Sequence, residues 1–247
     1  MAQIFKPSTN TLAKLSLLVA GIAPIALLFG GSAVTRSAAN TKVGVAVNQP
    51  VPFSHLHHAM ELGIECRYCH YTVERSPFAG MPTAQVCMSC HSQVWTNSPL
   101  LQPVRDSLKT GKPLVWSKVN KAPEFVYFDH SIHISRGINC NTCHGPVQKM
   151  PLMYKGRTFA MSWCLQCHRD PGKYIYKDPK NPDFKGSRQA FQPYWKLQKN
   201  QPLTEQERAI LEGEDLPPNA DAAKGTEIVS QMGVKIKQLE DCYTCHR

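Results

Sequence analysis

The pattern that most constrains this chain is Cys-x-x-Cys-His, which occurs five times and uses all ten cysteines. It is the attachment signature of a c-type haem, because the two thiols bind the haem vinyl groups and the histidine binds the iron from one face. The copies, numbered here motifs 1 to 5 in chain order, comprise Cys66, Cys69 and His70; Cys87, Cys90 and His91; Cys140, Cys143 and His144; Cys164, Cys167 and His168; and Cys242, Cys245 and His246.

A single Cys-x-x-Cys pair has other uses, as half of a zinc site or as a thioredoxin-like redox pair. Five copies, each followed by histidine and with no cysteine left over, favour haem instead. The sequence therefore predicts five covalently bound haem c groups. It also predicts that each motif histidine is the first axial ligand of its iron, and that the chain has no disulfide bond.

The histidines outside the motifs equal the haems in number. Of the ten histidines, five belong to the motifs and five remain: His55, His57, His58, His130 and His133. One further histidine for each iron would make every iron six-coordinate, whereas a catalytic haem needs an open coordination position. The count therefore predicts electron transfer, with no catalytic residue in this chain.

Three of the spare histidines, His55, His57 and His58, precede motif 1 on a predicted helix. Ser54 is a good N-cap and Gly63 a good helix stop, so a helix is expected from His55 to Leu62. His55 and His58 are three residues apart and share one face of that helix. Each of them can therefore reach a different haem.

The same arrangement occurs a second time, which predicts an internal duplication. Phe53-x-His55-x-x-His58 is repeated as Phe128-x-His130-x-x-His133, and each copy is followed by Gly-Ile and then by two motifs. Asp129 takes the place of the capping serine and keeps its function.

The duplication leaves the second ligand of motif 5 open. His57 is the remaining histidine, although its counterpart in the second copy is Ile132, and it lies about 160–200° around the helix from its neighbours. Met232 and Met161 are the alternatives, and a methionine ligand would raise the potential of that haem. Because the histidine count then closes, His57 is preferred over either methionine; buried methionine also more often fills gaps in a core.

The N-terminal segment predicts a membrane anchor. Residues 15–35 carry no charge and follow Lys6 and Lys14, and they are long enough to span a bilayer. The rival is a cleaved signal peptide, with small residues near 32–39 as its processing site. We expect a retained single-pass helix in the cytoplasmic membrane. The haem domain then lies on the extracytoplasmic (periplasmic) side, where c-type haem is normally attached.

The expected fold class is mainly α and irregular: a multihaem cytochrome c of c3/c7-like repeats behind a transmembrane helix. Chain 170–201 is expected to be irregular and superficial. A capping box at Thr204–Glu207 predicts a helix ending near Gly213, and a further helix is expected from Asp221 to Leu239. The expected domains are an anchor at 1–40, a dihaem unit at 50–94, a connector at 95–127, a second dihaem unit at 128–171 and a segment carrying motif 5 at 172–247.

The formal charge of +10 at pH 7 does not indicate nucleic-acid binding. Five haems would bring ten propionate carboxylates, so lysine and arginine are expected near them. No basic stripe with interleaved aromatic residues occurs, and we expect no nucleic-acid partner.

The F-x-H-x-x-H segment followed by Cys-x-x-Cys-His resembles the small multihaem cytochromes of the c3 and c7 type. In that family the first histidine ligates the haem just downstream and the second ligates a neighbouring haem. The resemblance therefore implies that His55 serves motif 1, His58 motif 2, His130 motif 3 and His133 motif 4.

Longer stretches resemble the pentahaem subunit of alternative complex III, a membrane quinol dehydrogenase complex. These are PFSHLHHAMELGIECRYCHYTVERSPFAGMPTAQVCMSCHSQ and MSWCLQCHRDP, and the resemblance covers roughly Pro50–Pro171. It implies a subunit that passes electrons from quinol oxidation to a downstream cytochrome or other acceptor. The implied partners are an iron–sulfur subunit, integral membrane subunits and a monohaem cytochrome.

Two enzyme classes compete with that function. One is a small membrane multihaem quinol dehydrogenase that oxidises quinol directly at a haem, and the other is a terminal multihaem reductase. Both need a vacant iron position and would show high-spin iron, against which the histidine count argues.

Overall fold

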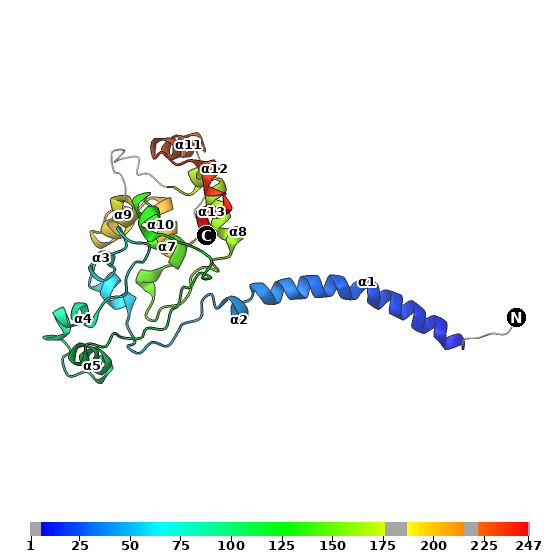
Figure 1. Ribbon diagram of the computed structural model, residues 1–247, viewed down its shortest axis with the longest axis horizontal. Coiled ribbons are helices and arrows are strands. Elements are labelled where there is room, and N and C mark those ends of the chain that lie inside the picture. Colours follow the sequence, from blue (N-terminus) through cyan, green and yellow to red (C-terminus); the bar gives the residue numbers. More distant parts are fainter. Residues whose placement is uncertain (1–5, 176–186, 215–221, 247) are drawn as a thin grey trace. The chain divides into compact units, whose positions relative to one another are not determined.

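The computed structural model describes residues 6–175, 187–214 and 222–246 (Figure 1). These residues form helices joined by irregular chain, with an isolated antiparallel β-bridge between Ala46 and Tyr154. The expected fold class, mainly helical and irregular, is confirmed. The chain divides into two units, Met1–Val43 and Gly44–Arg247, which are described separately.

The first unit contains α1 (Pro7–Arg36) and α2 (Ala38–Thr41). Pro24 lies inside α1 and does not interrupt it. The stretch Ser8–Arg36 is the one helix in the described ranges that is long and apolar enough to cross a membrane, and its apolar window is not buried. A membrane anchor and a signal sequence both have these properties.

The second unit consists of short helices, in keeping with its many prolines. In chain order they are η1 (Leu56–Glu61), α3 (Cys66–Cys69), α4 (Ala84–His91), η2 (Pro99–Leu101), α5 (Gln102–Thr110), α6 (His130–Ser135), α7 (Cys140–His144), η3 (Val147–Lys149), α8 (Met161–Arg169), η4 (Pro171–Lys173), α9 (Ser187–Gln198), α10 (Glu205–Glu212), α11 (Ala222–Gln231), α12 (Ile236–Leu239) and α13 (Cys242–Cys245).

The two histidine-bearing helices begin and end as their sequences predict. Before η1, the Ser54 hydroxyl accepts a hydrogen bond from the His57 backbone N–H at 3.1 Å, and before α6 the Asp129 carboxylate accepts one from Ser131 at 2.8 Å. Each helix stops at a glycine with positive φ, Gly63 at +68° and Gly137 at +81°. The first helix differs from expectation in its winding, because η1 is a π-helix.

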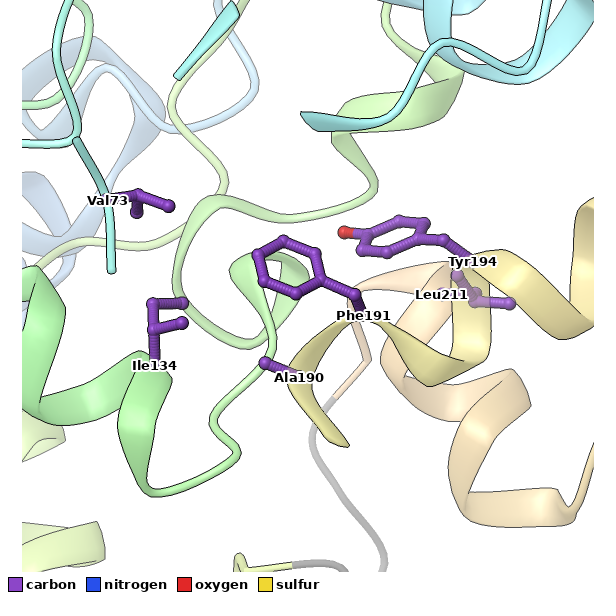
Figure 2. Packing of buried hydrophobic residues seen from close by; sticks show 6 residues of the cluster. All are labelled: Val73, Ile134, Ala190, Phe191, Tyr194 and Leu211. Atoms are coloured by element: carbon purple, nitrogen blue, oxygen red, sulfur yellow. The ribbon is translucent and has the colours of Figure 1, made fainter. Parts of the chain in front are cut away.

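The prediction of irregular, superficial chain over 170–201 was wrong for residues 187–198, while residues 176–186 lie outside the described residues. Helix α9 occupies 187–198, and its Ala190 and Phe191 are completely buried. Figure 2 shows these residues with Tyr194 of the same helix, packed against Val73, Ile134 and Leu211. The apolar residues of α9 recur at helical spacing, but the prolines and lysines of this stretch mask that pattern in the sequence.

Helix α10 confirms the predicted capping box and fastens α9 to the rest of the unit. Thr204 and Glu207 exchange both bonds of the box, and the helix ends at Gly213. The Glu207 carboxylate is fully buried and meets the Lys196 ammonium group of α9 at 2.8 Å. A buried carboxylate needs such a partner, because an unpaired charge away from water is strongly disfavoured.

The connector at 95–127 contains η2 and α5, whose Leu101 and Val104 are buried in a second apolar cluster with Ala84 of α4. One further expectation needs correction. The helix expected from Asp221 to Leu239 is two helices, α11 and α12, with Gly233 at φ +65° between them. Asp221 itself lies outside the described residues.

A buried polar network links motif 3 to α9 and α10. Asn141, inside motif 3, is completely buried. Its amide nitrogen donates to the Gln148 side chain at 2.7 Å and to the Leu211 carbonyl at 3.1 Å. Its amide oxygen accepts from the Tyr194 hydroxyl at 2.6 Å, and Asn139 accepts from the same hydroxyl at 3.1 Å. The network satisfies buried polar groups that would otherwise be costly.

Tyr194→Phe removes the hydroxyl that both asparagines accept from while keeping the ring in the core. We predict that the free energy of unfolding falls by about 1–3 kcal/mol, the usual cost of leaving buried acceptors without a donor. Denaturant unfolding of the haem-loaded chain measures it. Tyr71→Phe is the matched control, because Tyr71 is 60% exposed. Equal stability of the two variants would contradict the prediction.

Candidate haem-binding site

The five motifs fold into short helices that present their thiols and their histidines together. Motifs 1, 3 and 5 form α3, α7 and α13, while motifs 2 and 4 occupy the C-terminal halves of α4 and α8. All ten cysteines lie among the described residues, and each is a free thiol. The thiols that covalent attachment requires are therefore available.

Seven of the ten histidine rings are oriented by backbone carbonyls. A carbonyl only accepts, so the ring nitrogen Nδ1 that faces it carries the proton, and Nε2 keeps its lone pair for a metal. The motif pairs are His70–Gly80 at 2.7 Å, His91–Val94 at 3.0 Å, His168–Leu239 at 3.1 Å and His246–Phe125 at 3.1 Å. The pairs outside the motifs are His58–Ser54 at 2.8 Å, His130–Pro77 at 2.7 Å and His133–Asp129 at 2.7 Å.

Three motif histidines face a second imidazole at one common separation. The ring centroids are 6.2 Å apart in each of the pairs His58–His91, His130–His144 and His133–His168. With metal–nitrogen bonds of about 2.0 Å and each bound nitrogen about 1.1 Å from its ring centre, two imidazoles on opposite faces of one iron should lie about 6.2 Å apart. The spacing therefore fits an iron between the rings.

His55 and His70 lie near each other and near the pair His130–His144. The charge of His70 acts on the pKa of His55, and the charges of His130, His70 and His55 act on the pKa of His144. Burial, followed by these neighbours, lowers the pKa of His55 and of His144 to about 4, from an ordinary value near 6.5. Both imidazoles are therefore neutral at pH 7, which is the state that binds a metal.

One phenylalanine in each copy of the duplication positions the two histidines, a role that the sequence analysis did not assign. The ring of Phe53 stacks on His58 at 4.3 Å and meets His55 edge-on at 5.0 Å. In the second copy the ring of Phe128 stacks on His133 at 4.5 Å and meets His130 edge-on at 4.8 Å. The signal was present in the sequence, because phenylalanine occupies the same place in both copies.

The structure does not bring the candidates for the second ligand of motif 5 together with His246. His57 is bound by its Nδ1 to Glu61 at 2.7 Å, and its ring lies 5.4 Å from His58. Among the described residues, the ring of His246 contacts the ring of Phe125, with their centroids 5.7 Å apart. Met161 is 66% exposed at the start of α8, and Met232 is half-buried after α11.

This donor set matches covalently attached haem with two histidine ligands. Paired thiols stand beside imidazoles that have a free Nε2, and imidazole pairs have the separation that one iron requires. In agreement, the family described as cytochrome c7 and related cytochrome c matches residues 126–189, and the class III cytochrome C family matches residues 31–102. The chain belongs to the multihaem c-type cytochromes of the c3/c7 kind.

A relative is the multiheme cytochrome c subunit of menaquinone reductase from Nitratidesulfovibrio vulgaris (strain Hildenborough). It is 32% identical over 165 residues, which cover 58% of this chain and 76% of that protein. The similarity agrees with the multihaem cytochrome c family that the two family matches indicate.

His58→Ala should leave the iron of motif 2 without its second ligand, because His58 is the imidazole that faces His91. We predict the appearance of one high-spin haem in the electron paramagnetic resonance spectrum. It should vanish when Cys87 and Cys90 are also replaced by alanine. His57→Ala, on the same helix, is the control and should give no high-spin signal. A high-spin signal from a haem other than that of motif 2 would refute the pairing.

Proposed function

We propose that this chain is a membrane-anchored pentahaem cytochrome that relays electrons inside a quinone-linked respiratory complex. Haem iron supplies reversible one-electron exchange. The observation that carries the proposal is the second imidazole facing the histidines of motifs 2, 3 and 4, since an iron held between two imidazoles has no position for a substrate. The residues of this chain would hold the ligands in place, so that no coordination position is left for a substrate.

The proposed ligand set follows from the facing rings and from the family resemblance. All ten cysteines attach haem, so the chain holds five haem c groups. The motif histidines bind one face of each iron. The opposite ligands are proposed as His55 for motif 1, His58 for motif 2, His130 for motif 3 and His133 for motif 4.

For the complex itself we propose alternative complex III. The support is the resemblance of Pro50–Pro171 to its pentahaem subunit, together with the similarity to a cytochrome subunit of menaquinone reductase. Electrons from quinol oxidised in partner subunits would pass through this chain to a monohaem cytochrome or another acceptor. An iron–sulfur subunit and integral membrane subunits complete the proposed assembly.

The proposed organisation keeps the anchor, the two dihaem units, the connector and the motif 5 segment within the boundaries predicted from the sequence. Helix α1 supports an anchor, because its exposed apolar surface suits a lipid environment. Because c-type haem is attached outside the cytoplasmic membrane, the whole unit Gly44–Arg247 would lie on the extracytoplasmic side. The +10 charge then neutralises haem propionates.

The test of this function compares the isolated chain with the chain in its complex. We predict that the isolated chain carries five haems by intact mass, all low-spin, and that dithionite reduces them while menaquinol does not. In the complex, menaquinol should reduce them. A high-spin haem in the isolated chain, together with direct reduction by menaquinol, would instead support the small multihaem quinol dehydrogenase.

A second prediction concerns the anchor. The protein purified from membranes should retain residues 7–36, because the apolar surface of α1 holds it in the bilayer. N-terminal sequencing and intact mass measure this directly. A mature N-terminus near Asn40 would show that the segment is a cleaved signal.

For the second ligand of motif 5 we propose Met161 in place of His57. Helix α8 carries Met161 one turn before Cys164, and Cys164 interacts electrostatically with Cys245 of motif 5. His57, by contrast, has its ring 5.4 Å from His58, whose ring faces His91 of motif 2.

Met161→Leu should therefore convert one haem from low-spin to high-spin, because leucine cannot replace the thioether ligand. Met232→Leu is the matched control and should leave all haems low-spin. Room-temperature magnetic circular dichroism measures the spin states. Unchanged spectra in the Met161 variant would return His57 or Met232 to consideration.

A further inference from the structure

Motifs 1 and 2 are direct neighbours. Tyr68, inside motif 1, and Ser89, inside motif 2, share a hydrogen bond of 2.7 Å between their hydroxyl groups. Helix η1 bridges the same two motifs, because its His58 faces His91 while His55 interacts with His70.

Motif 1 also lies beside motif 3, although motif 2 separates them in the sequence. Cys66 of motif 1 and Cys140 of motif 3 pack against the same apolar cluster around Phe191. The loop after motif 1 holds His130, since the Pro77 carbonyl accepts from both its ring at 2.7 Å and its backbone N–H at 3.2 Å. The first motifs of the two duplicated units therefore meet.

Motifs 3 and 4 are joined in the same way as motifs 1 and 2. Helix α6 carries both His130, which faces His144, and His133, which faces His168. A second link runs through aromatic rings: Phe159 lies 6.0 Å from His144 and 5.8 Å from Trp163, the residue before Cys164 in motif 4.

Motif 5 packs on motif 4. The Leu239 carbonyl accepts from the ring of His168 at 3.1 Å, and the Glu240 carboxylate meets Arg169 at 3.2 Å. Leu239 and Glu240 come just before motif 5, so the last helices of the chain lie against α8. Figure 1 shows α13 and α8 near each other, with α4 on the opposite side of this unit.

From these contacts we propose that the five haem sites lie in the spatial order 2–1–3–4–5, and that motifs 2 and 5 are the two ends where electrons arrive and leave. Cysteine exposure agrees with this order. Cys90 of motif 2 and Cys242 of motif 5 are exposed, whereas the other eight cysteines are partly covered. The inference rests on the proposed five-haem relay and adds its order and its ends.

The redox chemistry at each end is a single-electron exchange. A one-electron carrier in a partner subunit is oxidised at one end as a ferric haem becomes ferrous. At the other end a ferrous haem becomes ferric as the acceptor, a second one-electron carrier, is reduced. No bond forms or breaks in the protein. Electron transfer to and from the partners would therefore need only an exposed haem edge at each end.

The order can be tested by removing one site at a time. Gln238→Cys places a thiol on the exposed part of the chain beside motif 5. It is the one free thiol when all ten native cysteines hold haem. A ruthenium photoreductant attached there injects one electron at a time, and absorbance reports how the haems are reduced. The matched variants lack the thiols of motif 2 (Cys87→Ala with Cys90→Ala) or those of motif 1 (Cys66→Ala with Cys69→Ala).

In the order 2–1–3–4–5, loss of motif 2 removes an end, and the four remaining haems should be reduced in one fast phase. Loss of motif 1 should isolate motif 2, so that one of the four is reduced slowly. The sequence order 1–2–3–4–5 requires the reverse, and a slow haem in the motif 2 variant would overturn the proposal.

The motif 2 variant decides the matter alone if the motif 1 variant does not fold. Intact mass separates the two levels of the argument. A parent protein with fewer than five haems contradicts the proposed function, whereas five haems with a slow phase in the motif 2 variant contradicts the order.

Discussion

The structure depends on the separation between facing imidazoles. Three pairs have centroids 6.2 Å apart, which suits one iron between two rings. Under the proposed ligation, an iron in each pair would fix a contact between residues 14 to 35 positions apart in the chain, a contact that a core of side chains would otherwise supply. Short helices are sufficient under this constraint, because each has only to aim one or two rings.

The apolar cluster and the polar network lie together where the two duplicated units meet. Phe191 and Tyr194 of α9 pack against residues from both units, and Tyr194 also satisfies Asn141 inside motif 3. This region has few haem ligands of its own, so ordinary packing and hydrogen bonding fix it. Helix α9 thus holds the two duplicated units together, as the paired histidines are proposed to hold the parts of each unit together.

The sequence predicted those features that depend on local chemistry. The Cys-x-x-Cys-His motifs, the caps at Ser54 and Asp129, the glycine stops and the capping box on α10 all follow from a few adjacent residues. Helix α9 could not be predicted in this way, because its apolar stripe is interrupted by Pro193 and by polar and basic residues, and its burial depends on distant partners. The π-winding of η1 likewise depends on tertiary contacts, since its sequence favours an ordinary turn.

The proposed order of the motifs in space accounts for how one duplication could produce a continuous relay. In each unit the histidine-bearing helix precedes and bridges its own two motifs. When the units are joined through their first motifs, motifs 2 and 4 lie at the two ends of the row of four. Motif 5 then lengthens the row at the motif 4 end. The extension makes the two ends chemically different. With a methionine ligand at motif 5, that end would have the higher potential, and electrons would run from motif 2 toward motif 5.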